Sequence, residues 1–314
     1  MLFQLLSLIT LLAGNNLAPG QTNRLPLDAN QPIKQEVLAS ETISGPARYA
    51  SQSEAGGPTR NPKMLGVKLT AAAAIVIDRE SGKILFAKNI HKQLAEASLT
   101  KIITAITVLD SGVKPDAMTT ISKAPLAIQP QGAHMRLAPG EKISLYNLLR
   151  GLLVSSANDA AIALGEYIAG SEEKFVSLMN QKARALGMTE SQFKNPHGID
   201  ADGHYSSAYD LAKAMDYALD KKVFREIIGT KNISFTTNVR PRFLKNSNKL
   251  LQNSYLNILG GKTGFTDNAG LCLIEVAANK QGHEIITVVL NSKNEWQESK
   301  GLIDWTFRAY TWPK

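Results

Sequence analysis

Short strand-like runs at both ends of the ordered part of the chain enclose a long stretch of helical periodicity, and this order constrains the fold most. Residues 71–78 (AAAAIVID) and 83–88 (KILFAK) are separated by four residues that include Gly82, a pattern typical of a β-hairpin. Two further short apolar runs follow at residues 270–278 and 284–291. We therefore predict a mixed α/β fold of the α+β type, with one antiparallel sheet flanked by helices and a mostly helical inserted subdomain.

The helical segments are identified by apolar residues that recur every three or four positions. Almost no charge interrupts this pattern in residues 98–109, which predicts a buried helix with Ser98 at its N-terminus. Ser171 precedes two glutamates and Gly187 follows the same pattern, as expected for a capped helix. The remaining helices are expected at residues 145–154, 159–168, 207–220 and 299–310.

The first 66 residues lack the periodicity of a folded domain. Residues 1–13 (MLFQLLSLITLLA) are free of charged side chains, which predicts a signal peptide or an N-terminal anchor over residues 1–18. No Lys or Arg precedes this stretch, so both interpretations stay open. Residues 19–66 are predicted to form a flexible linker, and residues 67–314 the folded domain. We expect an exported protein of the periplasm or cell envelope, attached to a membrane only if the N-terminal segment is not cleaved.

Charge and cysteine content exclude several classes of function. The formal net charge of +8 favours long-range attraction to polyanions. The basic residues are scattered rather than gathered in a stripe, so nucleic-acid binding is not expected. The single cysteine, Cys272, excludes an internal disulfide and a Cys-based zinc site. Because it lies in an apolar run, we expect it to be a buried core residue.

Ser98 and Lys101 form the first candidate catalytic pair. Acyl transfer by a serine needs a base that takes the hydroxyl proton. Three residues apart at the start of a helix, the two side chains lie on one face, and burial favours the neutral amine that a base requires. The same Ser-x-x-Lys string also begins at Ser111, Ser171 and Ser191, so this motif alone is weak.

Ser156 and Asn158 lie in the apparent turn between two predicted helices. A hydroxyl at this place can relay a proton, and the Asn amide can hold a peptide carbonyl. The alternative is that one of the two side chains only caps the helix that begins at Asp159. Taken alone, the motif favours the capping interpretation.

Lys262, Thr263 and Gly264 form the only Lys-Thr-Gly triplet of the chain, and Phe265 follows it. At a strand edge, Lys262 would supply a positive charge and Thr263 a hydroxyl donor for a substrate carboxylate. Gly264 would leave room for close approach of another backbone. The alternative is a glycine-rich turn with an exposed lysine, and three residues alone do not decide between the two.

The order of the three motifs is more informative than any one of them. Ser-x-x-Lys, Ser-x-Asn and Lys-Thr-Gly, in this order, are typical of penicillin-binding proteins and class A β-lactamases. The longer motifs are residues 97–102 (ASLTKI), 137–141 (LAPGE), 156–160 (SANDA), 195–200 (NPHGID) and 262–266 (KTGFT). With these motifs, roughly residues 69–312 resemble the D-alanyl-D-alanine carboxypeptidases, which are low-molecular-mass penicillin-binding proteins.

The resemblance implies a DD-peptidase/β-lactamase-like fold and a serine-type catalytic domain. Its expected activity is removal of the terminal D-Ala from peptidoglycan stem peptides through an acyl-enzyme, with β-lactam antibiotics as further ligands. It implies that Ser98 is acylated, that Lys101 is the base, and that Ser156 passes a proton to the leaving D-Ala. The family uses no metal or other cofactor. The expected catalytic residues are Ser98, Lys101, Ser156 and Lys262, and the expected substrate-binding residues are Asn158, Thr263, Gly264 and Phe265.

The backbone N–H groups of Ser98 and Phe265 would form the oxyanion hole, again by resemblance. One departure concerns the substrate carboxylate, which many relatives hold with an Arg shortly before the final helix. Residues 292–295 here read SKNE, so Lys293 is the nearest cation in the sequence.

Four alternatives remain at this point. His197, Asp200, Asp202 and His204 lie close together in the sequence and suggest a zinc site, although their Gly- and Asp-rich segment suits a turn. A class A β-lactamase would need a Glu for deacylation, and no Glu-x-x-x-Asn pattern lies between the second and third motifs. A DD-endopeptidase that cleaves cross-links would use the same catalytic groups. A catalytically silent wall-binding protein would not need complete motifs.

Overall fold

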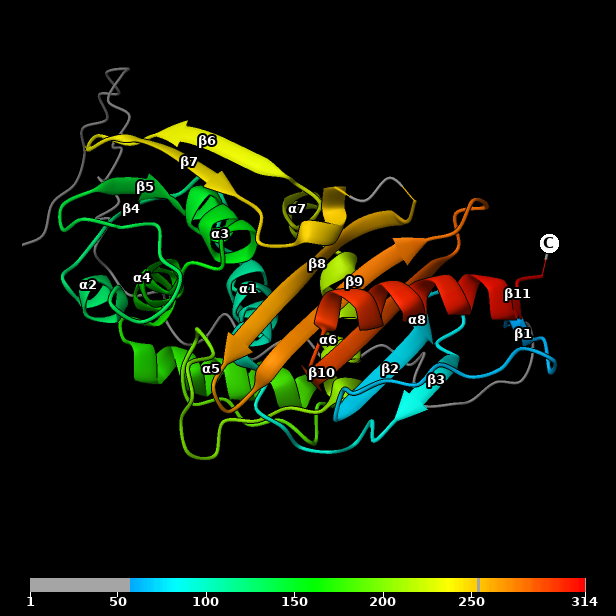
Figure 1. The fold of residues 1–314 in the computed structure, drawn as a ribbon. Coiled ribbons are helices and arrows are strands. Elements are labelled where there is room, and N and C mark those ends of the chain that lie inside the picture. The colour runs from blue at the N-terminus through cyan, green and yellow to red at the C-terminus, as the bar shows by residue number, and fades with distance from the viewer. Residues whose placement is uncertain (1–56, 253–254, 314) are drawn as a thin grey trace, which may run out of the picture. The chain divides into compact units, whose positions relative to one another are not determined.

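The structure, a computed structural model, describes residues 57–252 and 255–313. Its centre is a five-stranded antiparallel sheet with the strand order β3-β2-β10-β9-β8 (Figure 1). The strands are β2 (Ala73–Asp78), β3 (Ile84–Lys88), β8 (Asn257–Thr266), β9 (Gly270–Ala278) and β10 (Glu284–Ser292). Strands from both ends of the domain therefore share one sheet, which confirms the predicted fold class.

Helices cover both faces of the sheet, because alternate residues of its strands point to opposite sides. In β2, Ile75 and Ile77 belong to the large core beneath the inserted helices, whereas Ala74 and Val76 belong to the smaller core beneath α8 (Glu295–Ala309). Figure 1 shows α8 across the front of the sheet and α6 behind it. All of β2 is buried, as expected for a strand between two helical layers.

The inserted part between β3 and β8 is mostly helical, as predicted. Ser144, Ser171 and Ser207 each accept a hydrogen bond from a backbone N–H in the first helical turn, which fixes where three of the helices begin. The helices of this part are α1 (Lys101–Leu109), α2 (Ala124–Ile128), α3 (Leu145–Val154), α4 (Asn158–Ala169), α5 (Glu172–Ala185), α6 (Ala208–Leu219) and α7 (Lys222–Ile228).

Two small two-stranded sheets were not anticipated from the sequence. They pair β4 (Met118–Thr120) with β5 (Lys142–Ser144) and β6 (Asn232–Thr236) with β7 (Pro241–Lys245). Each of these strands buries at most one residue, so their apolar pattern is weak. The final helix also begins earlier than expected, because the Asn294 side chain caps it by accepting a hydrogen bond from the Gln297 N–H.

The predicted linker over residues 19–66 is wrong at its C-terminal end. Thr59–Arg60 forms β1, which pairs with β11 (Tyr310–Thr311). The Arg60 guanidinium lies 5.6 Å from the centre of the Trp305 ring, so this segment packs on the domain. A two-residue strand is too short to show a periodicity, which is why the sequence did not reveal it. The expected signal peptide or anchor and the linker residues 19–56 lie outside the described residues.

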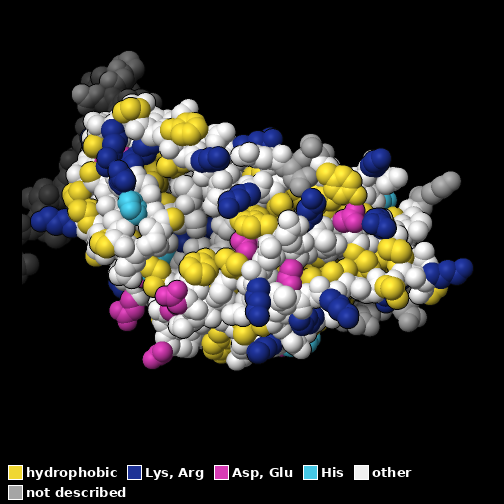
Figure 2. All heavy atoms as spheres, viewed as in Figure 1, with side chains coloured by type: hydrophobic (Ala, Val, Ile, Leu, Met, Phe, Trp, Pro, Cys, Tyr) yellow, Lys and Arg dark blue, Asp and Glu magenta, His cyan; other side chains and the backbone are white. Residues whose placement is uncertain are grey.

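Basic side chains are dispersed over the visible surface of the described part, as the sequence predicted. In the view of Figure 2, Lys and Arg side chains are scattered among polar and apolar ones and do not gather in a stripe. Cys272 is buried, as predicted. Within residues 57–252 and 255–313, no helix has both the length and the apolar content needed to cross a membrane.

Candidate active site

The candidate nucleophile lies in a tight turn that leads into a buried helix. Ala97–Thr100 forms a 3-10 turn, and α1 follows directly, so Ser98 and Lys101 lie on the same side of this junction. Lys101 Nζ is 2.8 Å from Ser98 Oγ and 2.5 Å from the carbonyl oxygen of His197. The helical spacing read from the sequence therefore places the expected base in contact with the expected nucleophile.

Lys101 has the protonation behaviour that a general base requires. Its side chain is completely buried. Burial, and then the nearby charge of Lys262, hold the pKa of Lys101 well below its usual value, and the carboxylate of Asp159 opposes them only in part. A neutral amine beside Ser98 can accept the hydroxyl proton.

The Ser156 turn does not have the capping role that the sequence alone favoured. Helix α4 begins after Ala157, and no side chain caps its N-terminus. Ser156 has a left-handed backbone (φ +60°), and its Oγ lies 2.8 Å from Lys262 Nζ. The Asn158 side-chain N–H group donates to the carbonyl oxygen of Gln131 at 2.7 Å, which fixes the amide at the cavity wall. Both side chains are thus arranged for the site rather than for the helix.

Lys262 lies on β8, which is the edge strand of the sheet, as predicted. Burial lowers the pKa of the Lys262 amine to about 7, so it exchanges its proton near neutral pH. Gly264 is needed because β8 approaches the nucleophile turn closely. A Cβ atom there would lie 2.9 Å from the carbonyl oxygen of Glu96 and 3.2 Å from the backbone nitrogen of Ser98.

The predicted residues surround one cavity of about 580 Å³. The two lysines are fully buried behind its wall, and each contacts one of the two serines. Phe265 is 63% exposed at the rim. The structure therefore brings together all eight residues predicted from the sequence. The predicted residues that line the cavity are Ser98, Ser156, Asn158, Thr263, Gly264 and Phe265.

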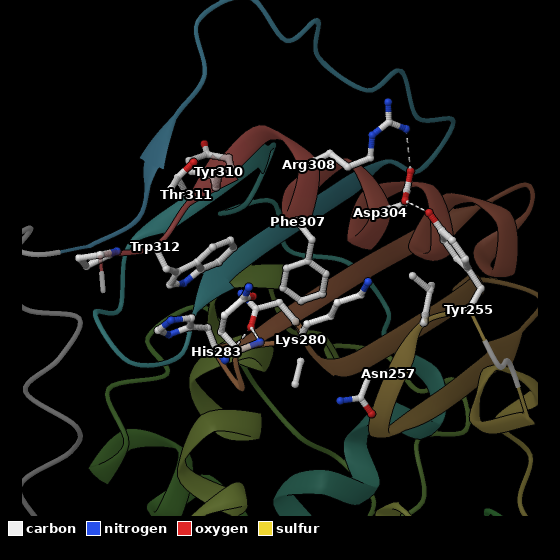
Figure 3. Close-up of a pocket in the computed structure, with 15 residues that line it drawn as sticks. Tyr255, Asn257, Lys280, His283, Asp304, Phe307, Arg308, Tyr310, Thr311 and Trp312 are labelled. Atoms are coloured by element: carbon white, nitrogen blue, oxygen red, sulfur yellow. Dashed lines mark hydrogen bonds and ion pairs between the residues drawn. The ribbon is translucent and has the colours of Figure 1, made fainter.

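A larger groove of about 1030 Å³ lies elsewhere and contains none of the predicted residues. Figure 3 shows it beside the C-terminal part of α8, where Phe307 and Trp312 pack with their ring centres 5.7 Å apart. Its other side chains include Tyr255, which hydrogen-bonds Asp304. No serine or cysteine is among the described residues that line it, whereas the smaller cavity holds two serines that each contact a lysine. The smaller cavity is therefore the candidate active site.

Ser247 is a cavity residue that the sequence did not reveal. Its Oγ lies 2.7 Å from Thr263 Oγ1, which places two hydroxyls side by side on the cavity wall. The flanking side chains of Asn246 and Asn248 are buried, and they donate to Thr230 and Glu275 respectively. The two asparagines thereby hold Ser247 in place. A serine between two asparagines is the only local signal, and it does not indicate a site.

The expected cation is not part of the cavity wall. Lys293 is exposed, and its backbone N–H donates to Thr70. The charged residues among those that line the cavity are carboxylates, namely Asp200, Asp267 and Glu295. A substrate carboxylate would therefore be held by hydroxyl and backbone groups, with the buried lysines behind them.

The segment that suggested a zinc site has other interactions. His204 Nε2 lies 2.8 Å from Glu96 Oε1, and Asp200 accepts hydrogen bonds from Thr266 and Asn268. Burial is the main cause that lowers the pKa of His197 to about 3. Among the described residues, no group of three or more His, Cys, Asp and Glu side chains is arranged to hold a metal ion.

Comparison with known proteins identifies the family. The D-alanyl-D-alanine carboxypeptidase family, peptidase family S11, matches residues 59–294. The chain belongs to this family. It is 36% identical over 247 residues to the D-alanyl-D-alanine carboxypeptidase DacF of Bacillus subtilis. The aligned residues cover 76% of this chain and 63% of DacF.

Other relatives agree with this assignment. The chain is 36% identical over 280 residues to the carboxypeptidase DacC of Escherichia coli, covering 85% of the chain and 66% of DacC. Penicillin-binding protein 5 of Haemophilus influenzae has a similar structure, with a TM-score of 0.72 and 32% identity over 78% of this chain and 72% of that one. The chain thus spans slightly less than two thirds of the two carboxypeptidases.

Proposed function

We propose that this S11 domain is a serine D-Ala-D-Ala carboxypeptidase that removes the terminal D-Ala from peptidoglycan stem peptides. One observation carries the proposal: two serines in one cavity each contact a fully buried lysine at 2.8 Å. One pair provides a nucleophile with its base, and the other provides a proton donor with its proton source. Acyl transfer to a serine needs both pairs.

Acylation begins at Ser98. The neutral amine of Lys101 takes the hydroxyl proton, and Ser98 Oγ attacks the carbonyl carbon between the last two D-Ala residues. The backbone N–H groups of Ser98 and Phe265 stabilise the negative oxygen that develops. Both residues line the cavity, as this role requires.

Departure of the terminal D-Ala needs a proton on its nitrogen. Ser156 gives its hydroxyl proton to this amine as the C–N bond breaks, and the Lys262 ammonium restores the proton to Ser156. The ester on Ser98 is then hydrolysed by water. Asn158 would bind a peptide carbonyl of the substrate, and the Thr263 hydroxyl would bind the carboxylate of the departing D-Ala.

The positions of these groups also indicate where the two parts of the substrate lie. The departing D-Ala lies near Ser156 and Lys262, so the longer acyl part of the peptide extends along β8 toward Phe265. An edge strand offers free backbone groups that can pair with an extended peptide. A β-lactam mimics the acyl-D-Ala-D-Ala end, so the same geometry supports its covalent reaction with Ser98. Peptidoglycan lies in the cell envelope, so the proposed substrate also supports export of the protein to the envelope.

The decisive experiment compares a stem pentapeptide with a cross-linked peptide dimer. We expect wild-type protein to release free D-Ala from the pentapeptide and Ser98→Ala to release none. Cleavage of the dimer without release of D-Ala from the pentapeptide would favour an endopeptidase. Intact mass after incubation with benzylpenicillin should show one adduct on the wild type. Rapid hydrolysis of the penicillin without a lasting adduct would favour a β-lactamase.

A further inference from the structure

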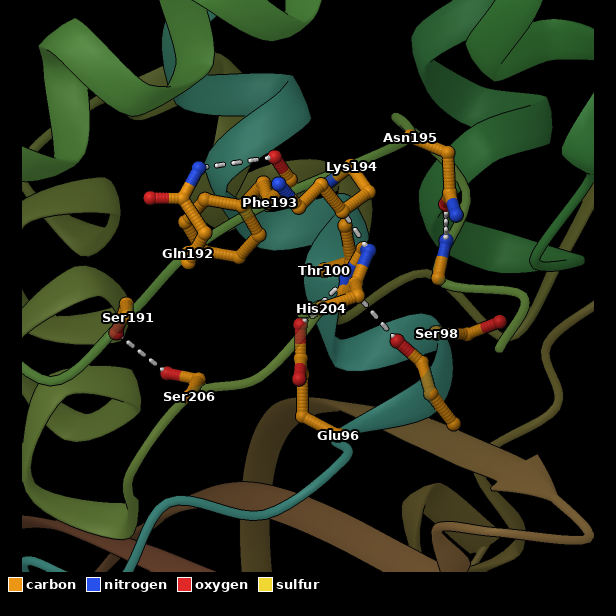
Figure 4. Close-up of polar contacts among 12 residues, drawn as sticks. Glu96, Ser98, Thr100, Ser191, Gln192, Phe193, Lys194, Asn195, His204 and Ser206 are labelled. Carbon is orange, nitrogen blue, oxygen red and sulfur yellow. Dashed lines mark hydrogen bonds and ion pairs between the residues drawn. The ribbon is translucent and has the colours of Figure 1, made fainter. Parts of the chain in front are cut away.

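Three buried polar side chains lie behind the nucleophile turn and have no role in the steps above. They are Glu96, Thr100 and His204, which we call the Glu96 network (Figure 4). Glu96 and Thr100 are completely buried, and His204 is 8% exposed. Burying a carboxylate and an imidazole is costly unless they are hydrogen-bonded, so their arrangement needs an explanation.

Hydrogen bonds assign the proton of the imidazole. The backbone N–H of Lys194 donates to His204 Nδ1 at 3.2 Å, so this nitrogen carries no proton. In a neutral imidazole the proton then lies on Nε2, which is 2.8 Å from Glu96 Oε1. His204 thus connects the backbone at Lys194 to the carboxylate of Glu96, as Figure 4 shows.

Thr100 extends the network to the backbone that precedes the nucleophile. Its Oγ1 lies 2.8 Å from Glu96 Oε1, 2.9 Å from His204 Nε2 and 2.8 Å from the carbonyl oxygen of Ala97. The Ala97 backbone is left-handed (φ +51°), which is unfavourable for a residue with a side chain. Contacts around this turn must therefore hold it.

The Ala97 carbonyl and the Ser98 N–H belong to one planar peptide unit. Holding the carbonyl oxygen therefore fixes the direction of the N–H. This N–H is one of the two proposed oxyanion donors. A carbonyl held by Thr100 on one side of the peptide thus directs the Ser98 N–H into the cavity on the other.

The loop that follows α5 adds a second link between the network and the base. The same segment that carries His204 also carries His197, whose carbonyl oxygen is 2.5 Å from Lys101 Nζ. Gly198 packs so closely against the turn that a Cβ atom would lie 1.9 Å from the Ala97 carbonyl oxygen. The loop therefore touches both the peptide of the oxyanion donor and the base.

We propose that Glu96, Thr100 and His204 are positioning residues that orient the Ser98 N–H toward the oxyanion. They act through the Ala97–Ser98 peptide, since no hydrogen bond among the described residues joins them to Ser98 Oγ or Lys101 Nζ. An oxyanion forms only as the bond to Ser98 forms, so the network raises the acylation rate more than substrate affinity. The proposal rests on acylation of Ser98.

Thr100 allows a matched test, because Val has nearly the same shape without the hydroxyl and Ser keeps the hydroxyl. The measurement is the rate of benzylpenicillin acylation at saturation and the concentration for half-saturation. We expect Thr100→Val to lower the saturated rate roughly tenfold or more while half-saturation changes less than about threefold. Thr100→Ser should stay within about threefold of the wild-type rate.

Glu96→Gln tests whether geometry or charge is required. Glu96 Oε2 is buried without a partner, so a Gln can keep the accepting oxygen and place its amide in the other position. We expect this variant to acylate at nearly the wild-type rate, and His204→Ala to be as slow as Thr100→Val. Ser191→Ala is the control, because it removes a nearby hydroxyl that is bonded to Ser206 (Figure 4) and that donates to Asp210. It should leave the acylation rate unchanged.

The outcomes separate this inference from the proposed function. An unmodified wild type would contradict acylation itself. A labelled wild type with Thr100→Val at the same saturated rate would overturn the positioning role, even if the melting temperature falls. A Glu96→Gln as slow as Thr100→Val would also overturn it, because charge would then be the requirement. Should His204→Ala fail to fold, the Thr100 pair still decides.

Discussion

Two buried lysines lie at the candidate active site, and they cannot both carry a full positive charge at low cost. In the proposed mechanism, Lys101 must be neutral to accept a proton, whereas Lys262 must hold a proton to pass one to Ser156. The charge of Lys262 is one cause of the lowered pKa of Lys101. A protonated Lys262 thus favours the neutral state that the proposed role of Lys101 needs.

The pH dependence of acylation follows from these two lysines. The pKa of Lys101 is well below its usual value, and protonation as pH falls through it removes the base, so the rate should fall on the acid side. The pKa of Lys262 is about 7, and its deprotonation above that pH removes the proton source for the D-Ala amine. We expect a bell-shaped profile of D-Ala release between about pH 5 and pH 10. A flat profile would contradict both roles.

Removing the charge at residue 262 should change the pKa of Lys101. In Lys262→Met the positive neighbour is absent, so the pKa of Lys101 should rise. The acid limb of the penicillin acylation rate should move to higher pH by about one unit or more. Lys280→Met removes an exposed charge in the distant groove and serves as the control. An unmoved acid limb in Lys262→Met would show that the two amines do not interact.

The candidate site can form only if β8 lies close to the nucleophile turn and in the correct register. Lys262 pairs with Ile274 and Gly264 pairs with Cys272 in the β8–β9 ladder. Two residues apart, Lys262 and Gly264 point to the same side of the strand. A slip of one residue would turn the lysine away from Ser156, so strand register decides whether the site forms.

Gly264→Ala should slow acylation, because its Cβ would push β8 away from the backbone of Glu96 and Ser98. We expect a loss of roughly tenfold or more in the benzylpenicillin acylation rate. Gly301→Ala is a matched control, since nothing lies within 4 Å of its added Cβ on α8. This control should keep the wild-type rate and gain up to about 1 kcal/mol in stability. Equal rates for both variants would show that the close approach is not required.

A buried ion pair between distant parts of the chain holds one wall of the cavity in place. Arg242 of β7 forms a buried ion pair with Glu141, with Arg242 Nη2 2.5 Å from Glu141 Oε2. The same guanidinium donates to the carbonyl oxygen of Met135, close to the wall residues 131–133. Burial alone would raise the pKa of Glu141, but hydrogen bonds, chiefly from Arg242, lower it. The β6–β7 hairpin therefore fixes the cavity from outside.

Arg242→Ala should destabilise the protein strongly, because Glu141 would stay buried without its partner. We expect the free energy of unfolding at neutral pH to fall by about 3–5 kcal/mol. Chemical denaturation measures this loss. Arg240→Ala on the same hairpin removes an exposed guanidinium that donates to Arg136, and it should cost less than about 1 kcal/mol. Similar losses in the two variants would contradict the special role of the buried pair.

Local sequence patterns predicted the long helices, the strands of the central sheet and the contact between Ser98 and Lys101. The Ser98–Lys101 contact arises within one helical turn, so the spacing of the two residues at the start of an apolar helix was enough to predict that their side chains meet. Capping serines and apolar periodicity located the long helices for the same reason. Strands with several buried residues were also visible, whereas the β6–β7 hairpin was not, because it buries only Ile233 and Arg242.

Tertiary structure alone decided the contacts between distant parts of the chain. Ser156 meets Lys262 across 106 residues, and His204 meets Glu96 across 108. Recognition of the motif order predicted the first meeting, but no local pattern contains it, and nothing in the sequence indicated the second. Such contacts depend on strand register and on how the helical insertion closes over the sheet. The lowered pKa of Lys101 likewise depends chiefly on burial, which is a property of the folded molecule.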